Sequence, residues 1–597
     1  MKKISTKYPK LIWILRNFIP MFLFPVANFY LFQLYLSKPW ESMHVPIQFL
    51  NIYLFELLMF ILFFIFGSLK IALRIQSIVF MVIGLANYFV ISFRSAPIMP
   101  WDIYSVGTAL SVADNYEYTI DQNTILVILG FIVLIIAESI VNLNINIKGK
   151  WKKTAICARL TCLVLFIALL CSFTSMLHKD TTIRKYKMYD KLFTPTVMSK
   201  RDGTAVAFLM ELQYLSIDKP NNYSQKTAGE LLNSYTSDDI TDDKKPNIIV
   251  IMNEAFSDLS VLGDFETNQE YMPFIHSLMS DETPDTVSGY LNVSVLGGNT
   301  ANTEFEFLTG NTMAFLPQGS VPYQQYVKKE TASIASHLKD LGYRTVGMHP
   351  YNSTGWDRNK VYPLLGFDES YFIRDYKNPE KIRKYVSDKA CYNEIIRLYE
   401  ENDKSNPLFI FNVTMQNHSS YTDDFDNFTP EIKVTGSNSK ALNNYMSLMK
   451  ISDDAIKNLI DYFTNVEDDT IIVFFGDHQP TNSVVSDIWK LNNKNGNNLS
   501  TDDEALRYVV PFFIWGNYDI AEASNVEISA NYLGAKLLDV SGLPLNSYSN
   551  FLLELSNEYP IVTSIRTKNS TGKSMDTKEA LDNLNNYAIL QYNSLFD

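Results

Sequence analysis

The pattern of apolar and polar positions divides the chain into two dissimilar parts. Up to about residue 177, Leu, Ile and Phe dominate, and few charged residues interrupt the apolar segments. Five of these segments are long enough to cross the roughly 30 Å of hydrocarbon in a membrane: residues 18–36, 49–66, 75–93, 124–141 and 154–177. One such segment alone could be a buried core helix. Five in succession predict an N-terminal transmembrane domain of five helices over residues 1–177.

Positive charge predicts the orientation of these helices. Lys and Arg cluster at the N-terminus and after the second and fourth helices, on one side of the membrane: Lys2, Lys3, Lys7, Lys10, Lys70, Arg74, Lys148, Lys150, Lys152 and Lys153. The segments on the opposite side carry only Lys38 and Arg94. Since cytoplasmic loops carry the excess of Lys and Arg, we expect a cytoplasmic N-terminus and an extracellular location for everything after residue 177.

The rest of the chain has a different periodicity. Residues 178–245 are polar, contain helical stretches and are interpreted as a helical linker. From residue 246 onward, short apolar runs typical of buried strands (248–252, 345–348, 408–413, 471–475 and 509–515) alternate with helical patterns (271–279, 332–341, 388–400 and 441–463). This alternation predicts an extracellular α/β catalytic domain over residues 246–597, with a mostly parallel central sheet covered by helices. Pro511 predicts that its strand lies at an edge, or that the proline takes a first position.

Metal-binding side chains follow the ends of four predicted strands. Glu254 follows the first, His349 the second, His418 lies shortly after the third, and Asp477-His478 follow the fourth. Ligands bind at the carboxyl ends of the strands in open α/β sheets, so we expect one metal-centred site. One histidine after a strand is readily explained as a residue of a surface loop. Three of the chain's seven histidines, each after a different predicted strand, are not explained as easily in this way. Oxygen ligands favour Mn²⁺ or Mg²⁺, and the absence of Cys ligands disfavours structural zinc.

A glycine-rich turn supplies a candidate nucleophile. Gly297-Gly298-Asn299-Thr300 precedes a predicted helix, and a helix N-terminus binds phosphate and favours an alkoxide. The alternative is plain helix capping, because Thr303 and Glu306 have the spacing of a capping box. Beside a metal that lowers the hydroxyl pKa, Thr300 is better interpreted as a nucleophile.

Four motifs resemble those of lipoteichoic acid synthases, which are five-span members of the alkaline phosphatase and sulfatase superfamily: Asn253-Glu254, Gly298-Asn299-Thr300, Trp356-Asp357-Arg358 and Gly476-Asp477-His478. The resemblance covers nearly the whole chain. It implies one Mn²⁺ (or Mg²⁺) ion bound by Glu254, Thr300, Asp477 and His478, and a glycerol-phosphate pocket formed by His349, Trp356, Arg358 and His418. It also implies that Thr300 attacks the phosphorus and that His418 protonates the leaving oxygen or holds the phosphate. Two alternatives stay open: core packing for Trp356 and a surface salt bridge for Arg358.

The resemblance implies transfer of glycerol phosphate from phosphatidylglycerol to a growing polyglycerolphosphate (lipoteichoic acid) chain through a phospho-threonine. The acceptor would be a glycolipid-anchored chain at the surface of a cell membrane. Asn253 stands where the family usually has Ser, and residues 349–355 diverge, so the exact donor and the acceptor stay open. Alternatives are a phosphoglycerol or phosphoethanolamine transferase acting on a glycolipid or glycan, or a phosphodiesterase or sulfatase-like hydrolase.

Composition narrows these choices. The sequence has no Cys/Ser-x-Pro-x-Arg site, which sulfatases require. Phosphoethanolamine transferases have disulfide-bearing domains, whereas Cys391 is alone in the predicted outer domain. A domain of this size without an internal disulfide fits a Gram-positive envelope. The net charge of -13 gives no support to nucleic-acid binding.

Overall fold

The computed structural model divides the chain into two compact units. One comprises residues 1–102 and 118–216, and the other comprises residues 103–117 and 217–597. The structure describes residues 13–94, 97–105, 120–146, 149, 151–189, 195–215, 217–237, 245–280, 283–317, 320–496, 499–575 and 577–597. Several residues used to predict the orientation lie outside this set: Lys2, Lys3, Lys7, Lys10, Lys148, Lys150 and the side chain of Arg94.

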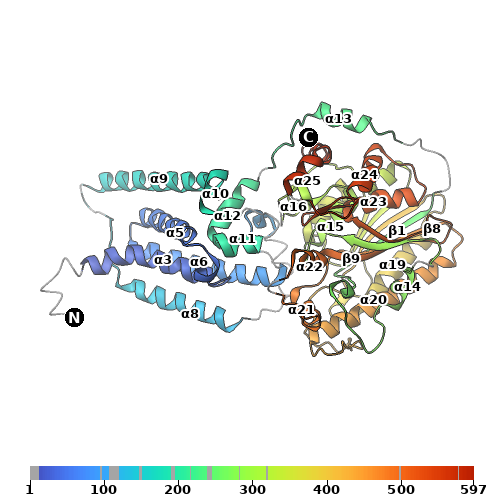
Figure 1. The fold of residues 1–597 in the computed structure, drawn as a ribbon, viewed down its shortest axis with the longest axis horizontal. Coiled ribbons are helices and arrows are strands. Elements are labelled where there is room, and N and C mark those ends of the chain that lie inside the picture. The colour runs from blue at the N-terminus through green and yellow to red at the C-terminus, as the bar shows by residue number, and fades with distance from the viewer. Residues whose placement is uncertain are drawn as a thin grey trace. The chain divides into compact units, whose positions relative to one another are not determined.

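The first unit is built from helices (Figure 1). Within the described residues, five are long and apolar enough to cross a membrane, which confirms the predicted number of spans. They are α3 (Ile19–Gln33, preceded by the π-helical turn Ile14–Phe18), α5 (Val45–Phe66), α6 (Leu69–Arg94), α8 (Gln122–Ala137) and α9 (Lys152–Leu177). Large apolar side chains such as Val133, Ile136 and Val164 are exposed on these helices, as expected of a surface that faces lipid.

The predicted linker is shared between the two units. Its helices α10 (Asp180–Tyr186), α11 (Pro195–Asp202) and α12 (Thr204–Glu211) belong to the first unit, as does the short helix α4 (Pro39–Ser42) near the start of the chain, whereas α13 (Gln225–Asn233) belongs to the second. Inside the first unit, Gln33 Nε2 donates to the carbonyl of Ser199 at 2.9 Å and Asn51 Nδ2 donates to that of Asp202 at 2.8 Å. These buried bonds hold the start of the predicted linker against the apolar helices.

An eight-stranded sheet forms the centre of the second unit. Its order is β10 (Ala523–Ser529), β2 (Thr286–Asn292), β9 (Val509–Gly516), β8 (Thr470–Gly476), β1 (Asn247–Asn253), β7 (Leu408–Val413), β3 (Arg344–His349) and β4 (Glu369–Phe372). Only β9 runs against the other strands, so the predicted mostly parallel sheet is confirmed. Two small antiparallel pairs, β5 (Lys381–Ile382) with β6 (Tyr385–Val386) and β11 (Ile561–Val562) with β12 (Thr567–Lys568), lie outside it.

The predicted place of the proline-containing strand is wrong. Strand β9 is an interior strand, antiparallel to β2 on one side and to β8 on the other. The ladder with β8 ends at the Phe475–Phe512 pair, one residue after Pro511. Pro511 lies beyond the last pair of the ladder with β8, so that ladder requires no N–H from it. The proline is therefore tolerated inside the sheet.

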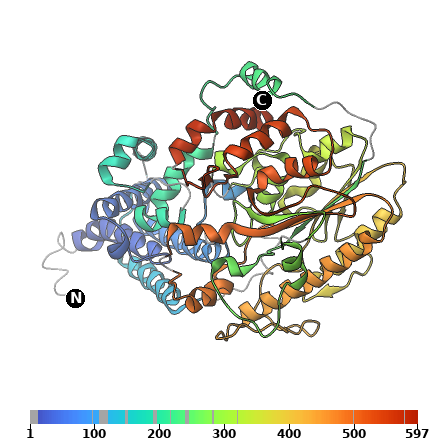
Figure 2. The same ribbon diagram turned by 45° about the vertical axis from the view of Figure 1, so that its right-hand side comes forward.

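Helices cover both faces of the sheet (Figures 1 and 2). Alternate residues of β1 point to opposite cores: Ile248 and Val250 to one, Ile249 and Ile251 to the other. The first core is covered by α15 (Thr300–Thr309), α17 (Ile334–Asp340), α18 (Arg358–Leu364) and α23 (Ala530–Val540). The second core is covered by α14 (Pro273–Leu278), α19 (Asp388–Glu400), α20 (Lys440–Thr464) and α21 (Asn482–Leu491). The predicted doubly covered α/β architecture is therefore confirmed.

The remaining helices of the second unit are α16 (Pro322–Gln325), α22 (Thr501–Ala505), α24 (Ser547–Glu558), α25 (Thr577–Asn583) and α26 (Asn585–Phe596). Helices α13, α24 and α26 share a third apolar cluster that includes Ala228, Phe551 and Leu590. This cluster fixes the C-terminal helix against the catalytic unit.

Candidate active site

Strand pairing brings the first candidate ligands together. Asn253, the last residue of β1, pairs with Gly476, the last residue of β8. The residues that follow therefore leave the sheet side by side. Glu254, Asp477 and His478 are buried, and one ligand atom from each lies within 4.8 Å of the other two. His478 Nε2 is 3.3 Å from Asp477 Oδ2 and 3.9 Å from Glu254 Oε1.

The electrostatics of this triad favour a cation. Burial, followed by repulsion from Asp477, raises the pKa of the Glu254 carboxyl, and burial also raises the pKa of Asp477. Asp477 Oδ2 and His478 Nε2 are buried without a hydrogen-bond partner among the described residues. Two desolvated carboxylates and a free imidazole nitrogen form a donor set that a divalent cation would satisfy. The residues therefore fit the metal dependence of the superfamily that the sequence resembles.

Thr300 lies beside the triad. It is the first residue of α15, after Asn299 in the left-handed region (φ 64°) and Gly298 at φ 155°, a value that disfavours any residue with a Cβ. The buried Thr300 hydroxyl donates to Glu254 Oε2 at 3.3 Å. All four predicted metal-site residues therefore meet at one point.

The capping-box alternative for this helix is wrong. Thr303 lies within the first turn of α15 and donates to the carbonyl of Asp477 at 2.8 Å. Glu306 accepts from Ser294 Oγ at 2.8 Å and from the amide of Met313 at 2.9 Å. Neither residue caps the helix, because their side chains join α15 to other segments.

His349 and His418 lie at the same edge of the sheet. The pKa of His349 is held well below its usual value by burial and then by the charge of Arg358. Its Nδ1 bonds the carbonyl of Val413 at 3.0 Å, which leaves Nε2 for a substrate. Desolvation, the largest cause, lowers the pKa of the partly exposed His418 ring to about 4. His418 Nδ1 lies 3.1 Å from the Tyr385 hydroxyl, so its orientation is also fixed.

Arg358 forms a buried ion pair, so the surface-salt-bridge alternative is wrong. The Arg358 and Glu304 side chains are 2% and 0% exposed. Arg358 Nε lies 3.0 Å and 3.2 Å from the two carboxylate oxygens, Nη2 also donates to Oε1, and the Tyr362 hydroxyl donates to Oε2 at 2.9 Å. Sequence reasoning missed Glu304, although it follows Thr300 by four residues and so shares its helix face.

Trp356 precedes this pair in an uncommon backbone conformation. Trp356 and Asp357 both have positive φ values, 55° and 58°. Such values in non-glycine residues cluster at functional sites. The Trp356 ring is half-buried and packs against the first core, so core packing accounts for part of its surface.

Breaking the buried ion pair is expected to destabilise the catalytic unit. In Glu304→Ala, the Arg358 charge stays buried without its partner, which costs about 3–5 kcal/mol. In the double variant Glu304→Met/Arg358→Met, which removes both charges, the loss should be smaller. Urea unfolding of the catalytic unit followed by tryptophan fluorescence measures both. If the single variant were as stable as the wild type, the pair would have no structural role.

Two buried arginines hold the loops that carry the histidines. Arg383 donates to the carbonyls of Gln416 and His418, both at 2.7 Å. Arg507 donates to Gln479 Oε1 at 3.0 Å and to the carbonyl of Pro480 at 2.5 Å, directly after His478. Both arginines are distant in sequence from the loops that they bind, so no local pattern indicated them.

A buried network of hydrogen bonds fixes the end of β1 next to the candidate metal site. Asn253 Nδ2 donates to Asp388 Oδ2, and Asn253 Oδ1 accepts from Asn417 Nδ2, both at 2.8 Å. Ser452 Oγ donates to the same Asp388 oxygen at 2.6 Å. Asn253 therefore ties β1 to the segment after β7 and to the first residue of α19, which explains why an amide suits this position.

The chain is similar to known proteins in sequence and in fold. Residues 246–543 match the model of the Sulfatase family. A putative cyclic beta-1,2-glucan modification protein of Rhizobium meliloti is 29% identical over 411 residues, which are 66% of this chain and 62% of that protein. Lipoteichoic acid synthase of Staphylococcus aureus is 27% identical over 240 residues, 39% of this chain and 36% of that protein. Both matches thus span less than two thirds of the relatives.

A solved structure shares the fold. The Streptococcus pyogenes phosphoglycerol transferase GacH, in complex with sn-glycerol-1-phosphate, superposes with a TM-score of 0.50 and 23% identity, over 63% of this chain and 95% of that one. The fold and the buried acidic site define an enzyme of the alkaline phosphatase and sulfatase superfamily. Residues 246–543 form a Sulfatase-family domain.

Proposed function

We propose that this enzyme transfers glycerol phosphate from phosphatidylglycerol to an acceptor hydroxyl, with Thr300 as the nucleophile. The observation that carries the proposal is the Thr300 hydroxyl, which begins α15 and donates at 3.3 Å to Glu254 inside the buried acidic cluster. The start of a helix stabilises developing negative charge on this oxygen. The matches to lipoteichoic acid synthase and the fold shared with a phosphoglycerol transferase support this reaction class.

In the proposed mechanism, Thr300 Oγ1 attacks the phosphorus and its proton passes to Glu254 Oε2. The bond to the diacylglycerol oxygen breaks, and His418 either holds the phosphate or, because the bound anionic phosphate raises the pKa of its ring, protonates this oxygen. A glycerophospho-threonine forms. An acceptor hydroxyl then attacks its phosphorus and gives its proton to His418, the bond to Thr300 Oγ1 breaks, and Glu254 returns its proton to Thr300. We assign His349, Trp356 and Arg358 to the glycerol-phosphate group of the donor.

Glu254, Asp477, His478 and Thr300 would hold one Mn²⁺ or Mg²⁺ ion. A bound divalent ion supplies positive charge that lowers the hydroxyl pKa and offsets the charge of the phosphoryl oxygens. The oxygen-rich ligand set with one imidazole favours these two ions.

The acceptor is the less determined substrate. A growing polyglycerolphosphate chain is one candidate, by analogy with lipoteichoic acid synthase. A glycan is the second candidate. The longer match, over 411 residues against 240, is to a putative glucan modification protein and favours the glycan.

A lipid donor requires the site to lie near the membrane surface. We propose that residues 178–597 are extracellular in a multi-pass protein of a cell membrane, as the distribution of Lys and Arg predicts. Ser224→Cys in the exposed segment before α13 should then react with an impermeant thiol reagent on intact cells. Lys153→Cys, at the start of α9, should react only after permeabilisation. Both variants belong in a background in which Cys157, Cys162 and Cys171 are replaced by serine, and the reverse labelling pattern would contradict this topology.

The function is tested with purified full-length protein, fluorescent phosphatidylglycerol and Mn²⁺. We expect diacylglycerol release that accelerates when an acceptor is added, with glycerol phosphate recovered on that acceptor. Parallel reactions with a neutral glucan oligosaccharide and with a glycerol-phosphate oligomer identify the acceptor. Release of free glycerol phosphate at a rate independent of any acceptor would instead indicate a hydrolase, and preference for phosphatidylethanolamine would change the donor.

A further inference from the structure

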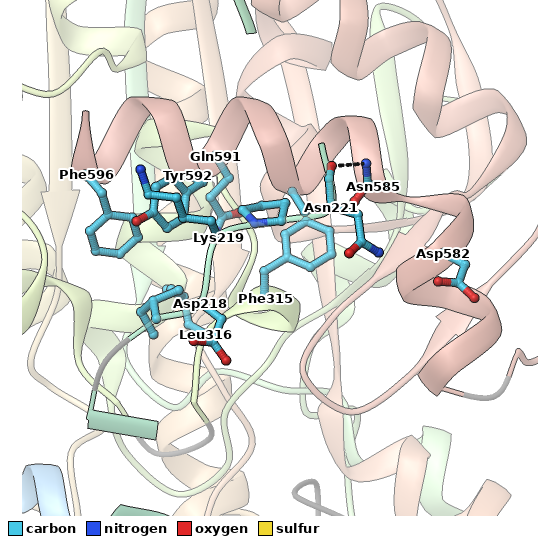
Figure 3. Close-up of a pocket in the computed structure, with 13 residues that line it drawn as sticks. Asp218, Lys219, Asn221, Phe315, Leu316, Asp582, Asn585, Gln591, Tyr592 and Phe596 are labelled. Atoms are coloured by element: carbon cyan, nitrogen blue, oxygen red, sulfur yellow. Dashed lines mark hydrogen bonds between the residues drawn. The ribbon is translucent and has the colours of Figure 1, made fainter. Parts of the chain in front are cut away.

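A second pocket lies in the catalytic unit at the C-terminal helix (Figure 3). It has a volume of about 240 Å³ and is formed by residues 217–221, by Phe315 and Leu316, and by helices α25 and α26. None of its lining residues belongs to the site described above. The pocket therefore needs its own explanation.

Aromatic rings form one part of its wall. Phe315 comes from the segment after α15, and Tyr592 and Phe596 come from α26, with their ring centroids 4.8 Å apart. All three rings also pack against other rings of the unit, but they are only partly buried, so part of each remains exposed in the pocket. Such rings offer a large apolar contact area at a low cost in conformational entropy.

The polar rim does not suit an anionic ligand. Asp218 and Asp582 are exposed carboxylates at this rim, and Lys219 is its one lysine. The Lys219 ammonium already lies 3.8 Å from Asp597 Oδ2 and 5.8 Å from the centre of the Tyr592 ring. A polymer of phosphodiesters would therefore meet two carboxylates and a lysine that is already engaged.

The pocket is joined to the nucleophile-bearing helix. Gln591 of α26 exchanges two bonds with the main chain of Thr312, at 2.8 Å and 2.9 Å. Further along the same segment, the carbonyl of Ser320 accepts from Asn302 Nδ2 at 2.8 Å, in the first turn of α15. Ser320 follows Leu316 by four residues, a span of at most about 14 Å. The segment between Thr312 and Ser320 therefore connects the pocket wall to the helix that begins with Thr300.

We infer that this pocket binds a neutral sugar unit of the acceptor glycan. The inference rests on the proposed transferase function and selects the glycan over the polyglycerolphosphate chain. The apolar C–H face of a sugar ring stacks on Tyr592 and Phe596, and the rim carboxylates and amides bond its hydroxyls. The pocket thus holds the acceptor while the donor occupies the acidic site.

The test separates acceptor binding from donor chemistry. In Tyr592→Ala, we expect the KM for a neutral glucan oligosaccharide to rise about 5- to 10-fold. The rate at which phosphatidylglycerol modifies Thr300 should stay unchanged. Tyr462→Ala, in α20 on the other face of the sheet, is the matched control and should alter neither value. An unchanged acceptor KM in Tyr592→Ala would overturn the inference.

A charge-reversal variant covers the case in which Tyr592→Ala fails to fold. Asp582 is exposed, so Asp582→Lys should fold normally, weaken oligosaccharide binding and strengthen binding of a glycerol-phosphate oligomer. Titration of both probes against full-length Thr300→Ala protein by calorimetry measures binding without turnover. Suppose that the wild type showed no transferase activity, and that it bound the oligosaccharide whereas Tyr592→Ala did not. The proposed function would then fail, but the assignment of a sugar site would stand. Oligosaccharide binding that stayed unchanged in Asp582→Lys would overturn the sugar assignment.

Discussion

Thr300→Ala should reduce transfer by roughly 10³-fold or more, because it removes the atom that forms the covalent bond. The substitution should leave the fold intact. Thr300 Oγ1 makes one described hydrogen bond, to Glu254, and alanine is a good helix former at the start of α15. Initial rates of diacylglycerol release measure the effect.

Thr300→Ser is the matched control for this variant. It keeps the hydroxyl and removes only a methyl group, so it should retain a measurable fraction of the activity. Circular dichroism should give the same spectrum for wild type and both variants. Near-normal activity in Thr300→Ala would contradict a threonine nucleophile and favour direct attack by water.

Removing the metal should have an effect of comparable size. Chelation is expected to abolish transfer, and added Mn²⁺ should restore it. At a free ion concentration of one hundred times Kd, binding should stabilise the folded protein by about 2.7 kcal/mol. The reason is that two buried carboxylates with raised pKa values gain a counter-charge.

Asp477→Asn tests which residues hold the ion. It keeps the shape of the side chain and removes its charge, so metal content and the stabilisation by Mn²⁺ should both fall. Asp461→Asn, on the exposed surface of α20, should keep both. Elemental analysis of the dialysed proteins and thermal unfolding provide the two measurements. Unchanged metal content in Asp477→Asn would place the ion elsewhere.

Local pattern predicts five of the eight strands of the sheet, β1, β3, β7, β8 and β9, but not β2, β4 and β10, which are not continuous apolar runs. Helix 388–400 was predicted at the bounds that α19 has, because its apolar residues recur at helical spacing. The strands that became β1 and β8 are continuous apolar runs, and their parallel pairing brings Glu254 and Asp477 together. The candidate metal residues could therefore be grouped from the rule that ligands bind at strand ends.

Long-range contacts could not be predicted in this way. Glu304 meets Arg358 across 54 positions, and Arg507 meets Gln479 across 28, so neither pair leaves a periodic signal. The edge position predicted for the strand of Pro511 was wrong. The prediction assumed that an interior strand has hydrogen-bond ladders along its whole length on both sides, whereas the ladder with β8 ends before it reaches Pro511. The division of the chain after Ser216 depends on tertiary packing of Gln33 and Asn51, which a polar linker composition does not reveal.

The most direct test of the account is to trap the covalent intermediate. Wild-type protein is mixed with phosphatidylglycerol and Mn²⁺ without an acceptor, quenched in acid and digested, and its peptides are analysed by mass spectrometry. The account predicts one glycerophosphate adduct, on the peptide that contains Thr300, and its disappearance when an acceptor is added before the quench. An adduct on another residue, or turnover of the lipid with no adduct on this peptide in the quenched samples, would contradict it.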